Sequence, residues 1–264
     1  MNAADIITAL DLPDDARVGR RVPKRLLVEN GTPAAGDGRR IEEGVEELVW
    51  VAALKPTTIG VPEYRDDVRE YLEISVLRLG LHPGAKGGRL IELVHRAVPY
   101  PVLLIAEQEG LTNVSAVHKR WSEGESGKTV LDGEMAATRT NATDPACGAH
   151  ADPLPPFYRA LALGRQPRAS LYTLYQGWID ALVALDIAWI TGTFGLPVSC
   201  QAAVDRRDAL REYTKLEAEI ARLRTAAEKE TQIPHQVDLN LEIRRLLADQ
   251  AGSRERMQTV GTVA

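Results

Sequence analysis

The sequence has few of the residues on which small enzymes commonly depend. Of its 264 residues, two are cysteine, five are histidine and 5% are aromatic. Cys147 and Cys200 match no zinc or redox spacing, and the histidines form neither H-x-x-x-H nor H-E-x-x-H. A G-x-S-x-G nucleophile motif is also absent. We therefore predict no catalytic residue, no metal ligand and no cofactor, and the sequence favours a protein that is not an enzyme.

Positive charge is outnumbered by negative charge, with 32 Lys and Arg residues against 37 Asp and Glu residues. The net charge at pH 7 is −5, which argues against a surface that binds nucleic acid over its whole extent but permits a local basic patch. The first residues, MNAADIITALDLPDD, are acidic where a signal peptide needs basic residues. Together with the two thiols, this predicts a cytoplasmic protein. The apolar run at 169–194 contains Asp180 and Asp186, whose burial in lipid is costly, so we expect no membrane span.

One stretch resembles a nucleotide-binding loop but lacks part of the pattern. SEGESGKT, residues 122–129, ends as a P-loop does, but Ser122 stands where the first glycine belongs. The flanking runs LTNVSAVHKRW and TVLDGEMAATRT are typical of two strands, whereas a P-loop joins a buried strand to a helix. We interpret SEGESGK as the polar loop of a β-hairpin, with a nucleotide site as the alternative.

The spacing of apolar residues predicts an α+β fold with a mixed-sheet domain over residues 1–140. Helices are expected at residues 3–10, 39–56 and 88–98, and strands at residues 70–81, 101–108, 111–121 and 129–140. The first two strands flank a helix and can pair in parallel through a crossover, while the last two are expected to be antiparallel. The very apolar strand at 101–108 is expected in the centre of the sheet.

The C-terminal part is expected to be helical. Residues 141–156 have the composition of a linker, residues 157–250 read as helices, and residues 251–264 read as a disordered tail. The helix at 205–231 carries a coiled-coil-like seam of apolar residues, and a helix packed on its own domain is the alternative. A second copy, another protein or the 169–194 helix must cover this seam. In the first two cases the seam is an interface formed by Tyr213, Leu216, Ile220 and Leu223.

Two basic clusters are the candidate binding residues for nucleic acid or an acidic partner. The first holds five cations within nine residues and the second lies on an expected strand. The first cluster contains no aromatic residue for base stacking. The alternative is an ordinary solvated face for the first cluster and a structural histidine for the second. The residues are Arg17, Arg20, Arg21, Lys24 and Arg25 in the first cluster, and His118, Lys119 and Arg120 in the second.

A metal-dependent nuclease remains the alternative from another functional class. Such a site places carboxylates and a lysine around Mg²⁺, commonly through an E-x-K pattern on a strand. Glu73 and Glu107 lie on expected strands, but no E-x-K follows either residue. A nuclease would therefore need carboxylates that converge only in three dimensions.

Six blocks together resemble a bacterial family known as domain of unknown function 4391. The blocks are RVPKRLL, EELVWVAALKPTTIGVP, EYLEISVLRL, AVPYPVLLIAEQ, SAVHKRW and QVDLNLEIRRL. The resemblance implies a genomic neighbourhood, because such proteins are typically encoded beside a Swi/Snf-type DNA helicase and an adenine-specific DNA methyltransferase. It implies no catalytic residue in this chain. We therefore expect a non-catalytic accessory subunit of a DNA-processing or phage-defence complex. Its expected partners are the helicase, the methyltransferase or both; DNA contact, homo-oligomerisation and a plain oligomeric scaffold remain open.

Overall fold

The computed structural model describes residues 2–31, 34–125, 127–140 and 152–259. These residues divide into two compact units. The first unit contains the described residues up to 140 together with residues 154–186, and the second contains residues 152–153 and 187–259. Most of the expected linker at 141–156 lies outside the described residues.

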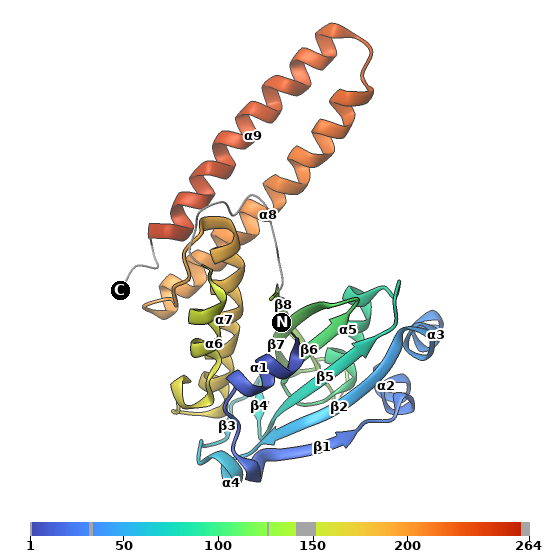
Figure 1. Cartoon of the computed structure of the whole chain (residues 1–264), viewed down its shortest axis with the longest axis vertical. Coiled ribbons are helices and arrows are strands. Elements are labelled where there is room, and N and C mark those ends of the chain that lie inside the picture. Colours follow the sequence, from blue (N-terminus) through green and yellow to red (C-terminus); the bar gives the residue numbers. More distant parts are fainter. Residues whose placement is uncertain (1, 32–33, 126, 141–151, 260–264) are drawn as a thin grey trace. The chain divides into compact units, whose positions relative to one another are not determined.

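A six-stranded mixed sheet forms the centre of the first unit, in the order β1-β2-β5-β6-β7-β8 (Figure 1). The strands are β1 (Arg17–Arg21), β2 (Val45–Leu54), β5 (Ile74–Leu81), β6 (Val102–Gln108), β7 (Leu111–Trp121) and β8 (Thr129–Arg139), and a separate hairpin pairs β3 (Tyr64–Arg65) with β4 (Glu70–Tyr71). Strands β5 and β6 are parallel, and all other neighbours in the sheet are antiparallel. The predicted α+β class, parallel crossover and 111–139 hairpin are confirmed.

Helices cover the sheet because alternate residues of its inner strands point to opposite faces. Leu77 and Leu104 pack with Leu27 and Leu93 in one core, under the helices on that side. The intervening residues, such as Leu103, are fully buried on the other face, where Figure 1 draws α6 and α7. The helices of this unit are α1 (Ala3–Ala9), α2 (Lys24–Gly31), α3 (Ala35–Gly44), α4 (Pro56–Ile59), α5 (Gly87–Ala97), α6 (Leu154–Leu161) and the larger part of α7 (Leu171–Thr191).

The predicted helix at 39–56 is wrong beyond Gly44, because the next ten residues form strand β2. This strand lies between β1 and β5, so both of its edges are paired. Its pairing with β5 shifts register between Val45 and Glu47 and again between Trp50 and Ala52. Each shift interrupts the alternation of side chains that marks a strand in the sequence. The apolar residues of this stretch are therefore spaced at intervals that are typical of a helix.

Helices α6 and most of α7 belong with the sheet, which extends the first unit beyond the expected boundary at residue 140. Tyr175 on α7 is fully buried, and its hydroxyl donates to the carbonyl oxygen of Val102 and accepts from the amide of Val117. The Trp178 indole donates to the carbonyl of Leu161 on α6 at 2.9 Å. Among the described residues, no helix combines the length and the apolar content that crossing a membrane requires.

The carboxyl group of Asp186 gives α7 a pH-dependent contribution to stability. Burial raises the pKa of Asp186 to about 6, so between about pH 4 and pH 6 the folded state binds more protons than the unfolded state. The free energy of unfolding therefore falls as the pH rises through this window. Asp186→Asn is expected to remove this slope and to stabilise the protein at pH 7 by about 2 kcal/mol. Urea titrations at pH 4 to 8 test this, with the exposed Asp67→Asn as control; equal slopes in both variants would contradict it.

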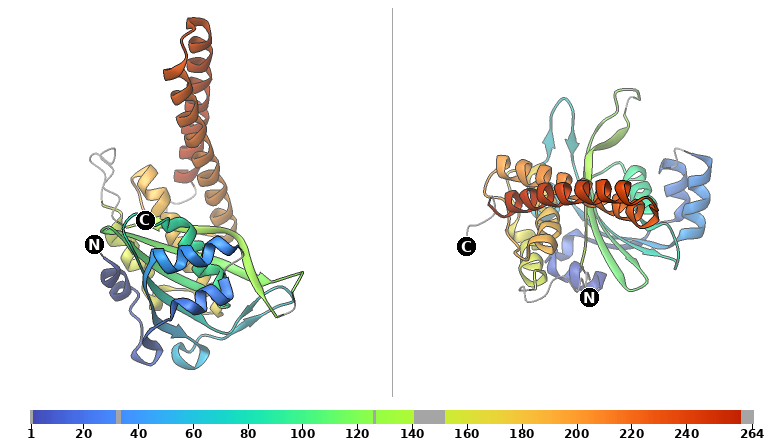
Figure 2. Two further views of the ribbon diagram at one scale, coloured as in Figure 1. Left: turned by 90° about the vertical axis from the view of Figure 1, so that its right-hand side faces the viewer. Right: turned by 90° about the horizontal axis from the view of Figure 1, so that it is seen from above.

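The second unit contains an antiparallel pair of long helices, α8 (Cys200–Lys229) and α9 (Ile233–Thr259), which lie side by side in Figures 1 and 2. Ile220 and Leu223 are buried against Ile243. At the two ends of the pair, Gln236 bonds to the carbonyl of Ala227 and Arg256 forms an ion pair with Glu212. The seam predicted at 205–231 is thus covered by α9 of the same chain, a cover that the sequence analysis did not consider.

This helical hairpin also bears on the predicted interface residues and on the predicted disordered tail. Tyr213 and Leu216 are half-buried in it, so the predicted interface of four residues is largely occupied within the chain. The tail expected from residue 251 is helical up to Thr259, and Ser253 and Met257 are buried on this last part of α9. Residues 260–264 lie outside the described part of the chain.

Candidate functional site

The five cations of the first basic cluster come together on one edge of the sheet. Strand β1 is an end strand, and α2 begins three residues after it. Apart from the half-buried Lys24, these side chains are exposed. We call this surface the basic edge, formed by Arg17, Arg20, Arg21, Lys24 and Arg25.

The members of the basic edge differ in how far the protein already neutralises them. Arg17 forms an exposed ion pair with Asp14 at 3.4 Å. Arg21 and Lys24 donate to the backbone carbonyls of Glu46 and Glu42, and these bonds leave their charges uncompensated. Within the described part of the chain, Arg20 and Arg25 form no ion pair and no side-chain hydrogen bond. The edge therefore presents guanidinium groups that an anionic partner can reach without breaking an internal ion pair.

A bulge shapes strand β1. Gly19 has a φ of +63°, a left-handed conformation that glycine adopts without the steric cost of a side chain. The pairing of β1 with β2 shifts register between Arg17 and Arg20, on either side of this glycine. Charged residues and bulges also protect exposed strand edges from aggregation. The arginines and the bulge of β1 therefore also protect this edge of the sheet from aggregation.

The second basic cluster is divided by the alternation of side chains along β7. Lys119 is 3% exposed, and its ammonium group donates to the carbonyls of His95 and Val98 at the C-terminal end of α5. Arg120 is half-buried and forms an ion pair with Glu123 at 2.9 Å. Lys119 is therefore unavailable to a phosphate, which corrects its assignment to a binding surface. A local run of basic letters does not reveal which face of a strand each residue occupies.

His118 lies in a cluster of tyrosines that the sequence analysis missed. Its Nδ1 is 2.5 Å from the Tyr71 hydroxyl and its Nε2 is 2.9 Å from Oε1 of Gln176. The imidazole stacks on Tyr172 with ring centroids 4.9 Å apart. Gln176 in turn donates to Asp180 at 2.8 Å. These residues come from β4, β7 and α7, which are far apart in the sequence. No short sequence pattern could therefore predict the cluster.

The arrangement of this cluster indicates a structural role. Burial raises the pKa of the Tyr71 phenol, which keeps its hydroxyl protonated. That hydroxyl can donate to Nδ1 of His118 while Nε2 donates to Gln176, which corresponds to a neutral imidazole. The polar atoms therefore satisfy one another across three elements. The chain of hydrogen bonds ties α7 to the sheet and needs no ligand.

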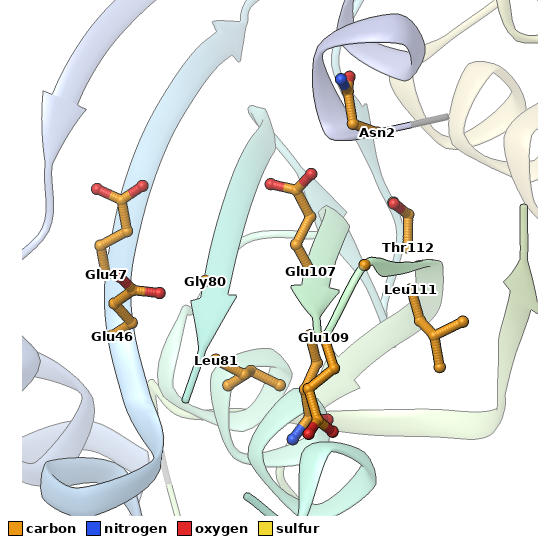
Figure 3. Close-up of a pocket in the computed structure, with 11 residues that line it drawn as sticks. Asn2, Glu46, Glu47, Gly80, Leu81, Glu107, Glu109, Leu111 and Thr112 are labelled. Carbon is orange, nitrogen blue, oxygen red and sulfur yellow. The ribbon is translucent and has the colours of Figure 1, made fainter. Parts of the chain in front are cut away.

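The carboxylates that a nuclease would need lie around a pocket of about 230 Å³ at one end of the sheet (Figure 3). Glu47 and Glu107 approach it from β2 and β6, but both interact with the guanidinium of Arg78. Glu107 also accepts from the amide of Ala3 at 2.8 Å. Glu73 lies apart from this pocket and pairs with Lys55 at 3.1 Å. In the part of the chain that the structure describes, no three His, Cys, Asp or Glu residues come together to hold a metal ion.

The glycine-lysine stretch lies in the turn between β7 and β8. The amide of Ser122 donates to the carbonyl of Lys128 at 2.8 Å, which closes the loop. The Lys128 ammonium pairs with Glu125 within the same loop. Strand β8 begins at Thr129, where a P-loop would begin a helix. The predicted hairpin loop is confirmed.

Comparison with known protein families assigns most of the chain to a family. A family model described as Domain of unknown function (DUF4391) matches residues 10–249, which is most of the chain. No curated protein and no solved structure matches the chain. The match assigns a family and does not identify an activity, so functional reasoning has to start from the surface described above.

Proposed function

The chain belongs to the DUF4391 family, and from this premise we propose that it is a non-catalytic accessory subunit of a bacterial DNA-processing or phage-defence complex. Its proposed partners are the helicase or adenine-specific methyltransferase subunits expected beside it, with DNA as a further ligand. The proposed setting is the bacterial cytoplasm. The basic edge is the observation that carries this proposal, because five cations lie on the end strand β1 and the start of α2 in a chain whose net charge is −5.

The basic edge suits an anionic ligand for physical reasons. Arginine binds phosphates and carboxylates through two parallel hydrogen bonds. Because Arg20 and Arg25 have no anionic partner among the described residues, binding would not first have to break a salt bridge. Arginines placed along DNA also displace condensed counterions, which makes such binding depend strongly on salt.

A second surface supports docking to a protein. Ile233, Val237 and Leu241 on α9 are 75%, 52% and 56% exposed. Their spacing of four residues places them along one stripe of the helix, while Ile243 on another face of α9 is buried against α8. An exposed apolar stripe on a helix is a common contact surface for a partner protein. The proposal assigns this stripe to the enzyme subunit.

Co-expression with the products of neighbouring genes tests the proposed complex. We expect the helicase or the methyltransferase to co-purify with the wild-type chain at a fixed stoichiometry through size-exclusion chromatography. Val237→Asp with Leu241→Asp should abolish this co-purification, because two buried carboxylates oppose the contact. Absence of both enzymes from the wild-type complex would contradict the proposed function.

Charge reversal at the basic edge tests its role in DNA binding. Arg20→Glu with Arg25→Glu is expected to weaken binding of a labelled 20-bp duplex by about tenfold or more. The slope of log K against log salt should become shallower by about 2, since about 0.9 is lost for each phosphate contact. Fluorescence anisotropy at several salt concentrations measures both quantities.

The matched control for this experiment is Arg224→Glu with Arg244→Glu, which changes the net charge equally at two exposed arginines of the hairpin. We expect this control to retain wild-type affinity and salt slope. If the two double variants behave alike, net charge alone governs binding and the basic edge is not the DNA site.

A further inference from the structure

An apolar cavity of about 220 Å³ lies next to the basic edge, on the sheet face that carries α2. Trp50 and Leu77 line its floor from β2 and β5, and Val98 closes it beyond the end of α5. Leu26 and Tyr100 also line it and are 41% and 39% exposed. The cavity is thus bounded by side chains that solvent, and therefore a ligand, can reach.

Arg20 lies on the same face of the sheet as this cavity. Its Cα is paired with that of Trp50 across the two antiparallel strands, and directly opposed residues carry their side chains on the same face of a sheet. Arg20 therefore extends over the face into which the Trp50 ring points. Since Arg20 forms no ion pair among the described residues, the site combines an apolar cavity with an adjacent uncompensated positive charge.

The dimensions favour a side chain over a whole cofactor. Small-molecule sites usually enclose roughly 300–1,000 Å³, and this cavity is smaller. A single aromatic or aliphatic side chain is an occupant of suitable size. Figure 1 shows β1 as the outermost strand of the sheet, so its outer edge has backbone groups that an extended peptide can pair with.

We propose that the basic edge and this cavity together bind an extended acidic segment of a partner protein. One aromatic or aliphatic side chain of that segment enters the cavity between Leu26 and Trp50, and neighbouring Asp or Glu residues contact Arg20 and Arg21. This inference rests on the proposed role as a subunit that binds other proteins, and it specifies the chemistry of one binding partner. The arginines favour a segment with negative charge, and the cavity favours a segment with one large apolar side chain.

Selection from a display library of random 12-residue peptides on the purified full-length chain tests this inference. We expect enrichment of peptides in which one large apolar side chain is flanked by Asp or Glu. Synthetic versions should bind at least tenfold more weakly to Leu26→Asp and to Arg20→Glu. They should bind normally to Leu247→Asp, a matched control that makes the same substitution at an exposed leucine of the hairpin. Tyr100→Asp repeats the test at the opposite wall if Leu26→Asp proves unstable.

The outcomes separate this inference from the proposed function. Failure to enrich acidic peptides, or equal binding to Leu26→Asp and wild type, overturns the inference. If no acidic peptide is enriched but the enzyme subunits still co-purify, the proposed function stands and the arginines serve another ligand, such as DNA. If acidic peptides bind as expected but neither enzyme co-purifies, the docking site stands and the assignment to a DNA-processing complex falls.

Discussion

Replacing Lys119 with methionine is expected to lower the free energy of unfolding of the first unit by about 3 kcal/mol. The ammonium group donates to the carbonyls of His95 and Val98, which lie where α5 ends and its carbonyls lack partners within the helix. Methionine has a similar length but no donor, so two carbonyls lose their partner. Each unsatisfied buried acceptor costs about 1–3 kcal/mol, which exceeds what removing a buried amine returns.

The pH dependence distinguishes this role from simple packing. Burial lowers the pKa of Lys119 to about 7, whereas the unfolded chain has the ordinary lysine value near 10.4. Between these values the unfolded state binds more protons, so this lysine makes the free energy of unfolding rise with pH from about 7 to about 10. Lys119→Met should lack this rise. The difference in stability between wild type and variant should therefore grow as the pH increases.

Urea unfolding at pH 7, 8 and 9, followed by tryptophan fluorescence, measures both effects. The control is Lys128→Met, at an exposed lysine in the turn of the same hairpin. We expect this control to remain within about 0.5 kcal/mol of wild type. Equal stability of the two variants would mean that the contacts of Lys119 with α5 contribute nothing.

The double variant Ile220→Asp with Leu223→Asp is expected to unfold the α8–α9 hairpin and to leave the first unit folded. Both side chains are almost fully buried and pack against Ile243. Removing a buried aliphatic side chain costs about 2–5 kcal/mol, and burying an unpaired carboxylate adds several kcal/mol. Because the units are separate and compact, this loss should remain in the second one.

Circular dichroism and limited proteolysis measure the result. We expect a large loss of helical signal and rapid cleavage between residues 200 and 259, with a protected fragment that ends before residue 200. Ala221→Asp with Arg224→Asp is the control, since both positions are exposed on the same helix. If helical signal persists while an oligomer dissociates, the seam is an interface between chains, as the sequence alone had allowed.

Local patterns in the sequence determined much of the first unit. The amphipathic run at 88–98 predicted helix α5, and the apolar runs on either side of it predicted the parallel strands β5 and β6. The polar stretch 122–128 predicted the turn between β7 and β8. These elements can be predicted from the sequence because each depends on apolar periodicity or turn residues within a window of about a dozen residues.

Only the tertiary structure shows that residues 45–54 form a strand, and only the tertiary structure shows where the basic side chains lie. Strand β2 has helix-like apolar spacing, but pairing on both edges and two register shifts make it a strand. Adjacent His118 and Lys119 were indistinguishable in the sequence, yet Lys119 caps a helix while His118 joins a tyrosine cluster. Arg20 acquired its place beside Trp50 through the register of β1. Each of these outcomes depends on which distant segment of the chain pairs with or packs against the residue. A local sequence pattern reflects only neighbouring residues and therefore cannot identify that segment.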